Sequence, residues 1–181
     1  MRTPAVRLIP MLCPKCQTPV PAEPGEIAWV CAACGQGMIL DDEAGLRPLE
    51  FHYSAALTAG KPGQPYWSAY GTVAITERKA LIANSEAEYQ SNIMWRKPRR
   101  LFVPAFTLPP SEQIDVSIDL LLKHQDLEAG DPVDFRPVTV RPDQMRPLLE
   151  IVIMRIETAR ADKLSSILFN LQLTEPELWI L

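Results

Sequence analysis

The chain has 181 residues, of which 47% are hydrophobic and 22% charged, and its formal net charge is −4 at pH 7. This balance is typical of a globular protein and excludes a disordered chain. No stretch of about 18 apolar residues occurs, so we expect no membrane span. The length leaves room for a small module joined to one domain of ordinary size.

The N-terminal segment does not resemble a secretion signal. Pro4 and Pro10 interrupt its apolar residues, and no hydrophobic core with a small-residue cleavage site follows. We therefore expect a cytoplasmic protein. Thiols stay reduced in that compartment, which favours metal binding over disulfide bonds for its cysteines.

All four cysteines of the chain lie in one short segment, as two C-x-x-C pairs separated by fourteen residues: Cys13, Cys16, Cys31 and Cys34. Two residues between thiols allow a tight turn to direct both sulfurs at one metal, and a second such turn completes a tetrahedral site. The segments "EIAWVC" and "QGMIL" predict strands around the second pair. Gly35, directly after Cys34, suits a backbone turn with positive φ.

This segment resembles a zinc ribbon over residues 11–41, with the four cysteines in the ligand positions. The resemblance implies a structural zinc ion, because four protein ligands leave no open position for water or substrate. A module of about thirty residues has too small a core to fold by burial alone, so zinc would supply most of its stability. Gln17 departs from the pattern, since many such turns have glycine there. We expect the first turn to be less regular than the second.

Two other uses of the cysteines stay open at this stage. A rubredoxin-like site would bind iron and carry electrons, because tetrahedral sulfur suits either metal. Redox chemistry at a C-x-x-C pair is a weaker alternative, since the βαβ context of thioredoxin-like proteins is missing.

Residues 42–64 predict a linker with some ordered structure, including a strand at "RPLEFHYSA". A second domain of α+β class is expected over residues 65–181, with a mixed antiparallel sheet and one or two helices. Its first strand is "YWSAYGTVAI", where Gly71 marks a candidate bulge, and its second is "RRLFVPAFTL", where Pro104 indicates an edge strand.

The C-terminal half predicts two helices and two strands. "PPSEQIDVSIDLLLKHQ" has helical spacing with Ser111 as its cap, and "RPDQMRPLLEIVIMRIETARADKL" predicts a longer helix with Pro147 in its first turn. "SSILFNLQL" and "ELWIL" predict closing strands. The residues expected in the core are Trp67, Phe102, Ile151, Ile156, Phe169 and Leu171.

No catalytic constellation is visible, so we expect no enzyme activity. The two histidines, His52 and His124, lie far apart, and the glycine-rich and nucleophile motifs of common enzyme classes are missing. An acidic run over residues 115–134 does not follow the spacing of a calcium-binding loop. We interpret it as a solvated surface.

One dense basic patch occurs at "MWRKPRRLF". It combines Trp95 with four cations, and aromatic rings among cations are typical of single-stranded nucleic-acid sites. The alternative is an edge strand whose charges contact a protein partner or the acidic part of the chain. We favour that alternative because the whole chain is acidic. The cations are Arg96, Lys97, Arg99 and Arg100.

Together these features predict a non-catalytic zinc-binding protein that acts as an interaction or scaffolding component with an unknown protein partner. Nucleic-acid binding in the transcription or translation machinery is the alternative, and electron transfer through iron is the second alternative. One fold hosts many functions, so the ribbon resemblance does not choose among them.

Overall fold

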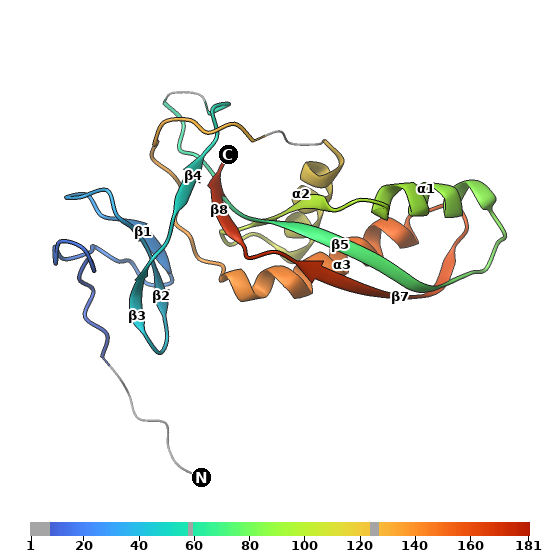
Figure 1. Cartoon of the computed structure of the whole chain (residues 1–181), viewed down its shortest axis with the longest axis horizontal. Coiled ribbons are helices and arrows are strands. Elements are labelled where there is room, and N and C mark those ends of the chain that lie inside the picture. The colour runs from blue at the N-terminus through green and yellow to red at the C-terminus, as the bar shows by residue number, and fades with distance from the viewer. Residues whose placement is uncertain (1–7, 58–59, 124–126) are drawn as a thin grey trace, which may run out of the picture.

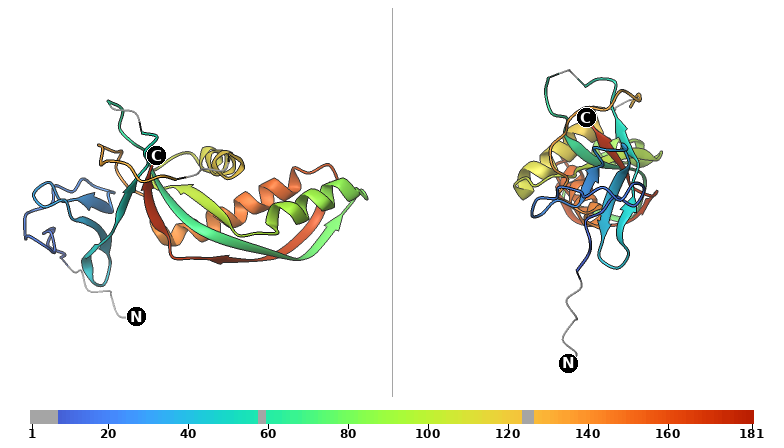
Figure 2. Two further views of the ribbon diagram at one scale, coloured as in Figure 1. Left: turned by 45° about the horizontal axis from the view of Figure 1, so that its top comes forward. Right: turned by 90° about the vertical axis from the view of Figure 1, so that its left-hand side faces the viewer.

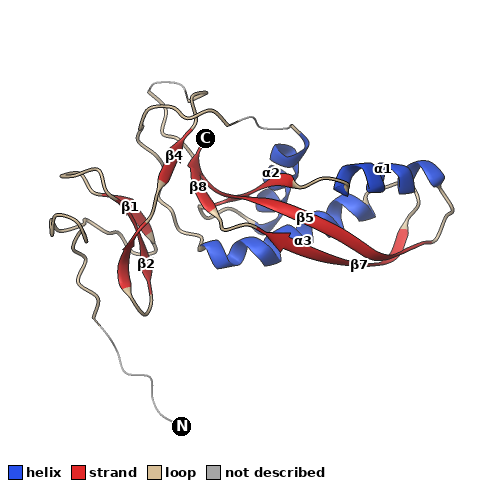
Figure 3. Cartoon of the chain, viewed as in Figure 1, coloured by secondary structure: helices blue, strands red, loops and turns tan. Residues whose placement is uncertain are grey.

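The structure of the protein is a computed structural model that describes residues 8–57, 60–123 and 127–181. It contains two sheets and a layer of helices, which confirms the predicted α+β class (Figure 1). The small N-terminal part contains strands and loops, and the described helices all belong to the larger part (Figure 3).

The N-terminal sheet is antiparallel in the order β1-β2-β3. Its strands are β1 (Ala28–Val30), β2 (Gly37–Asp41) and β3 (Gly45–Pro48). The first two were predicted, whereas β3 lies in the predicted linker. Asp41 forms the turn between β2 and β3 because its Oδ1 accepts the backbone N–H groups of Glu43 and Ala44 at 2.9 and 2.8 Å.

The larger sheet has the order β4-β8-β5-β6, with β7 also paired to β5. Its strands are β4 (Phe51–Tyr53), β5 (Pro65–Ala80), β6 (Arg99–Pro104), β7 (Leu164–Leu173) and β8 (Glu177–Ile180). The long strand β5 lies at the centre of this sheet. The first part of β5 pairs with β6 and β8, and the remainder pairs with β7. β6 is an edge strand, as Pro104 indicated. β4 pairs in parallel with β8, so the predicted linker contributes a strand to this sheet.

The bulge in β5 is not at Gly71. The register of the β5–β7 pair shifts between Ile75 and Glu77 instead. Gly71 has a packing role, because a Cβ atom there would lie 2.3 Å from Cδ1 of Leu101 on the neighbouring strand. The prediction of a bulge at Gly71 was therefore wrong.

The helices are α1 (Ser85–Trp95), α2 (Pro110–Leu122) and α3 (Met145–Thr158), the last preceded by a 3-10 turn, η1 (Pro142–Gln144). The sequence predicted α2 and α3 but not α1. Pro147 does lie in the first turn of α3. Ser111, in contrast, does not cap α2, because that helix begins at Pro110 and Pro109 occupies the cap position without a side-chain hydrogen bond.

The helices α1 and α3 lie side by side over the β5–β7 pair (Figure 2). Asn84 caps the N-terminus of α1, and its side-chain oxygen accepts the N–H of Ala87 at 3.1 Å. Its buried face consists of Ala87, Ser91 and Trp95, of which two are small. A helix that buries so few large apolar residues shows no clear hydrophobic period, which explains why its sequence did not predict it.

Trp67 and Leu171 are buried in the main core as predicted, and Phe102 is buried in a second cluster with Tyr66 and Phe106. Ile156 and Phe169 are partly buried against the main core. Ile151 is 42% exposed, so its predicted place in the core was wrong. α3 buries Leu149, Val152 and Ile153 toward the sheet, and Ile151 lies on another side of the helix.

The N-terminal sheet is attached to the larger part through this same core. Ile27 and Ala28 belong to the main core cluster, and the backbone N–H of Ile27 donates to the carbonyl oxygen of Val138 at 2.9 Å. The N–H of Leu49 also donates to the carbonyl oxygen of Gly37 at 2.9 Å. The bond at Ile27 thus attaches the cysteine-bearing segment to the larger part, and the bond at Leu49 continues the pairing next to β2.

Candidate metal centre

The two C-x-x-C pairs form two turns with the same hydrogen-bond pattern. In the first, the N–H of Gln17 donates to the carbonyl oxygen of Cys13 at 2.9 Å, and in the second the N–H of Gly35 donates to that of Cys31 at 2.8 Å. Gln17 and Gly35 both have positive φ, at 60° and 71°. The first turn is therefore as regular as the second, and the expectation of an irregular turn was wrong. The Gln17 side chain also donates to the carbonyl oxygen of Cys13 at 3.2 Å.

The four sulfur atoms lie in one cluster, within 4.8 Å of one another. The Sγ atoms of Cys13 and Cys34 are 3.7 Å apart, and those of Cys16 and Cys31 are 3.6 Å apart. Bonds of about 2.3 Å from a tetrahedral metal would place sulfurs about 3.8 Å apart, whereas a disulfide requires about 2.05 Å. The separations thus fit a tetrahedral metal site. Each close pair joins one cysteine from each turn, so both turns would contribute to a single site.

A small apolar cluster supports the sulfurs. Cys13 and Cys31 are buried, Cys34 is half-buried and Cys16 is exposed. The two buried cysteines pack in one cluster with Val20, Trp29 and Met38. The sulfurs therefore form one end of the N-terminal part's own core, consistent with the zinc-ribbon resemblance.

The electrostatics of the cluster also favour a bound cation. The hydroxyl and backbone groups of Thr18 lower the pKa of Cys16 to about 6. At Cys34, a backbone hydrogen bond from Gln36 lowers the pKa, but burial and the three neighbouring thiols outweigh it and raise the pKa to about 12. Thiolates packed so closely repel one another, and a bound cation would remove that repulsion.

The basic patch is divided between buried and exposed positions. Trp95 is 7% exposed, and its indole N–H donates to Oε1 of Glu157 at 2.9 Å. Arg99 donates through Nε to the carbonyl oxygen of Met94 at 2.6 Å, which closes the turn between α1 and β6. Arg96 and Lys97 are exposed.

Arg100 contacts the C-terminal strand of its own chain. Its Nη2 lies 3.1 Å from Oε2 of Glu177, and its guanidinium lies over the rings of Tyr70 and Trp179, at 5.1 and 5.2 Å from their centroids. The structure therefore does not bring Trp95 and the four cations together on one stacking surface. Trp95 cannot stack on a base because it is part of the core.

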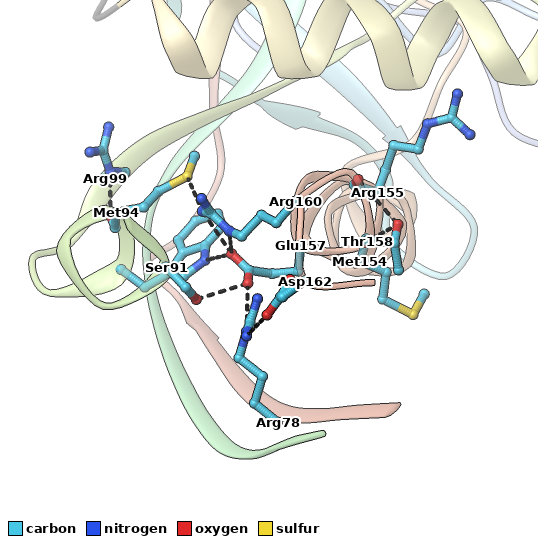
Figure 4. A network of polar contacts seen from close by, with 11 residues as sticks. Arg78, Ser91, Met94, Arg99, Met154, Arg155, Glu157, Thr158, Arg160 and Asp162 are labelled. Carbon is cyan, nitrogen blue, oxygen red and sulfur yellow. Dashed lines mark hydrogen bonds and ion pairs between the residues drawn. The ribbon is translucent and has the colours of Figure 1, made fainter. Parts of the chain in front are cut away.

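A buried network of charges was missed by the sequence analysis (Figure 4). Glu157 is fully buried on α3, and its carboxylate accepts hydrogen bonds from Ser91 at 2.8 Å, Arg78 at 3.2 Å and Arg160 at 2.9 Å, in addition to Trp95. Arg78 also pairs with the buried Asp162. These partners come from β5, α1 and the loop after α3. Nothing in their sequence spacing indicates that they meet.

His52 lies on β4, the parallel neighbour of β8 in the larger sheet. His52 lies 3.8 Å from the carboxylate of Glu50 and stacks on Trp179 with ring centroids 4.9 Å apart. His124 and Asp126 lie outside the described residues. Within the described ranges, no group of three or more cysteine, histidine or acidic side chains other than the cysteine cluster is placed to hold a metal ion.

Comparisons with known proteins give no relative. No protein-family model matches the chain, and no curated protein or solved structure matches it significantly. In the part of the chain that the structure describes, no helix is long and apolar enough to cross a membrane.

Proposed function

We propose that the protein is a non-catalytic, cytoplasmic zinc protein that acts as an interaction or scaffolding component. Zinc would be bound by Cys13, Cys16, Cys31 and Cys34. The observation that carries the proposal is the cluster of four sulfurs within 4.8 Å, supplied by two matching turns. Four protein ligands complete a tetrahedral site, so the metal stabilises the fold and does not act on a substrate.

Iron is the chemical alternative, and metal analysis of the purified protein distinguishes the two. We expect one zinc per chain and no visible absorption. A ferric tetrathiolate would instead be coloured, and its presence would favour electron transfer. Replacement of Cys31 by serine should abolish stoichiometric metal binding, whereas the exposed Ser111→Ala variant should bind the metal normally.

The interaction role is supported by the position of the cysteine segment. Strand β1, which leads into Cys31, forms one wall of a cleft of about 840 Å³, and residues 132–135 and Pro137 line the opposite side. A zinc-stabilised strand beside an open cleft is suited to hold a partner rigidly. The contribution of zinc would be to keep this wall ordered.

Cross-linking in the native cell, followed by mass spectrometry, tests the interaction role. We expect the wild-type chain to cross-link to a protein partner and the Cys31→Ser chain to lose it. Recovery of RNA or DNA in place of protein would favour the nucleic-acid alternative. A chain that cross-links to neither would contradict the proposed function.

A further inference from the structure

The cleft beside β1 begins where two backbone segments separate. Ala28 forms a bridge with Val138, and the N–H of Ile27 donates to the carbonyl oxygen of Val138 at 2.9 Å. Beyond this point the chain at Trp29 and Val30 and the chain at residues 132–135 and Pro137 line opposite sides of the cleft of about 840 Å³. The two segments thus run beside each other like neighbouring strands, but they are bridged only at Ala28 and Val138 among the described residues.

One wall of this cleft has an unpaired strand edge. In the β1–β2 ladder, the carbonyl of Ile27 bonds to Leu40 and the N–H of Cys31 bonds to Gln36. Backbone groups alternate in direction along a strand, so those of Val30 point away from β2. Val30 itself lines the cleft.

The opposite wall has an edge of the same kind. The carbonyl oxygen of Asp134 accepts the N–H of Gly63 at 2.8 Å, and the N–H of Arg136 donates to the carbonyl oxygen of Gly63 at 2.9 Å. These bonds hold residues 134–136 to Gly63 on one side. The backbone groups of Phe135, between them, point to the other side, where the cleft lies. Among the described residues, neither Val30 nor Phe135 has a backbone hydrogen bond outside the strand ladders.

The side chains around these edges are apolar with two carboxylates. Both acids lie on the walls, Glu26 near β1 and Asp134 opposite, and no lysine, arginine or histidine lines the cleft. The apolar and aromatic lining includes Val20, Trp29, Tyr53, Pro132, Phe135 and Pro137. The rings of Tyr53 and Phe135 lie 6.4 Å apart, which makes part of this wall aromatic.

We propose that this cleft, which we term the β1 slot, binds an extended peptide segment of a partner protein in which apolar residues alternate with lysine or arginine. The segment enters as a strand and bonds to the edges at Val30 and Phe135, as in other cases of strand addition to a free sheet edge. Its apolar side chains contact the aromatic wall, and its cations pair with Asp134 and Glu26. The inference rests on the proposed interaction function and names the partner's chemistry.

The negative charge of the cleft walls favours a basic peptide over nucleic acid and over a second copy of this chain. Phosphate groups would be repelled by carboxylates on both walls, so nucleic acid is excluded from the slot. A second copy of this chain carries a net charge of −4 and is less complementary than a basic segment.

Selection from a phage-displayed library of random 12-residue peptides on the metal-loaded full chain tests the proposal. We expect the enriched peptides to alternate apolar and basic residues. Synthetic copies of them should bind Asp134→Arg at least tenfold more weakly than the wild type. Asp115→Arg makes the same charge change at an exposed position on α2 and should leave the affinity unchanged.

The backbone contacts have their own test. Methylation of alternate backbone nitrogens in a selected peptide removes its strand-forming N–H groups and should abolish binding in one of the two registers. In spectra of the ¹⁵N-labelled chain, the unmethylated peptide should shift the amide signals of Val30 and Phe135.

Three results contradict the slot. They are a library that yields no binder, enriched peptides that are acidic, and binding that Asp134→Arg leaves unchanged. Peptides that bind elsewhere on the chain would overturn the slot while the interaction function stands. Failure of the proposed function itself would appear as a chain that cross-links to no protein in the cell.

Discussion

At the scale of single residues, the two cysteine turns have different residues at the position where the backbone is strained. Gly35 and Gln17 both have positive φ, a conformation that costs a residue with a side chain about 1–2 kcal/mol. No atom lies within 4 Å of a Cβ added at Gly35, so a substitution there changes the backbone energy alone. The chain tolerates this cost at Gln17, where the side chain gains a hydrogen bond to Cys13.

We therefore predict that Gly35→Ala lowers the free energy of unfolding by about 1 kcal/mol and that Gln17→Gly does not lower it. Chemical denaturation of the metal-loaded protein measures both. The pair serves as its own control, because each variant exchanges glycine and a side chain at an equivalent position. A larger loss for Gln17→Gly than for Gly35→Ala would show that the hydrogen bond to Cys13 outweighs backbone strain.

Glu157 links the helices α1 and α3 to strand β5. Its buried carboxylate joins α1, α3 and β5, and removal of one partner from a buried charge network leaves other charges uncompensated. We predict that Glu157→Gln destabilises the protein by about 3–5 kcal/mol. Urea denaturation gives the value, and Glu150→Gln, in a half-exposed ion pair with Arg146, should change it by less than about 1 kcal/mol.

Asp162 gives the network a dependence on pH. The hydrogen bond from Arg78 holds the pKa of Asp162 below its ordinary value of 3.8. A carboxylate whose pKa is lower in the folded state stabilises the protein above the unfolded pKa, and this contribution is lost as the pH falls through the folded pKa. We predict that Asp162→Asn destabilises the protein at pH 7 and that its difference from the wild type shrinks as the pH falls below 3.8.

Denaturation series at pH 7, 5, 4 and 3 on both proteins measure this difference. Loss of metal at low pH affects the wild type and Asp162→Asn equally, so it cancels in the difference between their stabilities. Asp115→Asn, an exposed carboxylate, is the matched control. A difference that stays constant down to pH 3 would contradict the role assigned to the Arg78–Asp162 pair.

At the scale of elements, the predicted boundary near residue 60 separates two strands that pair with each other, β4 and β8. The sequence predicts a linker over residues 42–64, which suggests that a fragment starting near residue 60 folds alone. That fragment would lack β4, the parallel neighbour of β8, and would expose the edge of β8. It would also lack Ile27 and Ala28, which pack in the main core.

We predict that a fragment beginning at residue 49 unfolds more cooperatively than one beginning at residue 60, because only the longer one retains β4. Both should be less stable than the full chain, since each loses the contact of Ile27 with Val138. Thermal melts followed by circular dichroism compare the three. If the two fragments melt identically, β4 contributes nothing to the larger sheet's stability.

At the scale of the whole molecule, the acidic charge and the internal contacts of Arg99 and Arg100 limit binding to nucleic acid. Only Arg96 and Lys97 of the basic patch are exposed. Two phosphate contacts give a salt slope of about −1.8 on duplex DNA, or about a tenfold loss of affinity between 50 and 200 mM salt. We predict no sub-micromolar binding of DNA or RNA at 150 mM salt, measured by fluorescence anisotropy. Tight binding that is lost in Arg96→Glu/Lys97→Glu would contradict this.

Local spacing in the sequence determined the cysteine turns, the strands next to them and the two more apolar helices. These features depend on residues a few positions apart: a repeated C-x-x-C, alternation along a strand, or an apolar stripe on a helix. The α+β class followed from their order. Helix α1 was missed because its buried face is small, and Ile151 was wrongly placed in the core although it lies outside the face that α3 buries.

Only the tertiary structure decided which distant residues meet. The partners of Glu157 come from three separate segments, and the β1 slot exists because Val138 joins β1 and the chain then separates from it. Such contacts depend on the path of the whole chain and leave no period in the sequence. For this reason the cluster of four cysteines could be predicted from spacing, whereas the buried charge network and the unpaired strand edges could not.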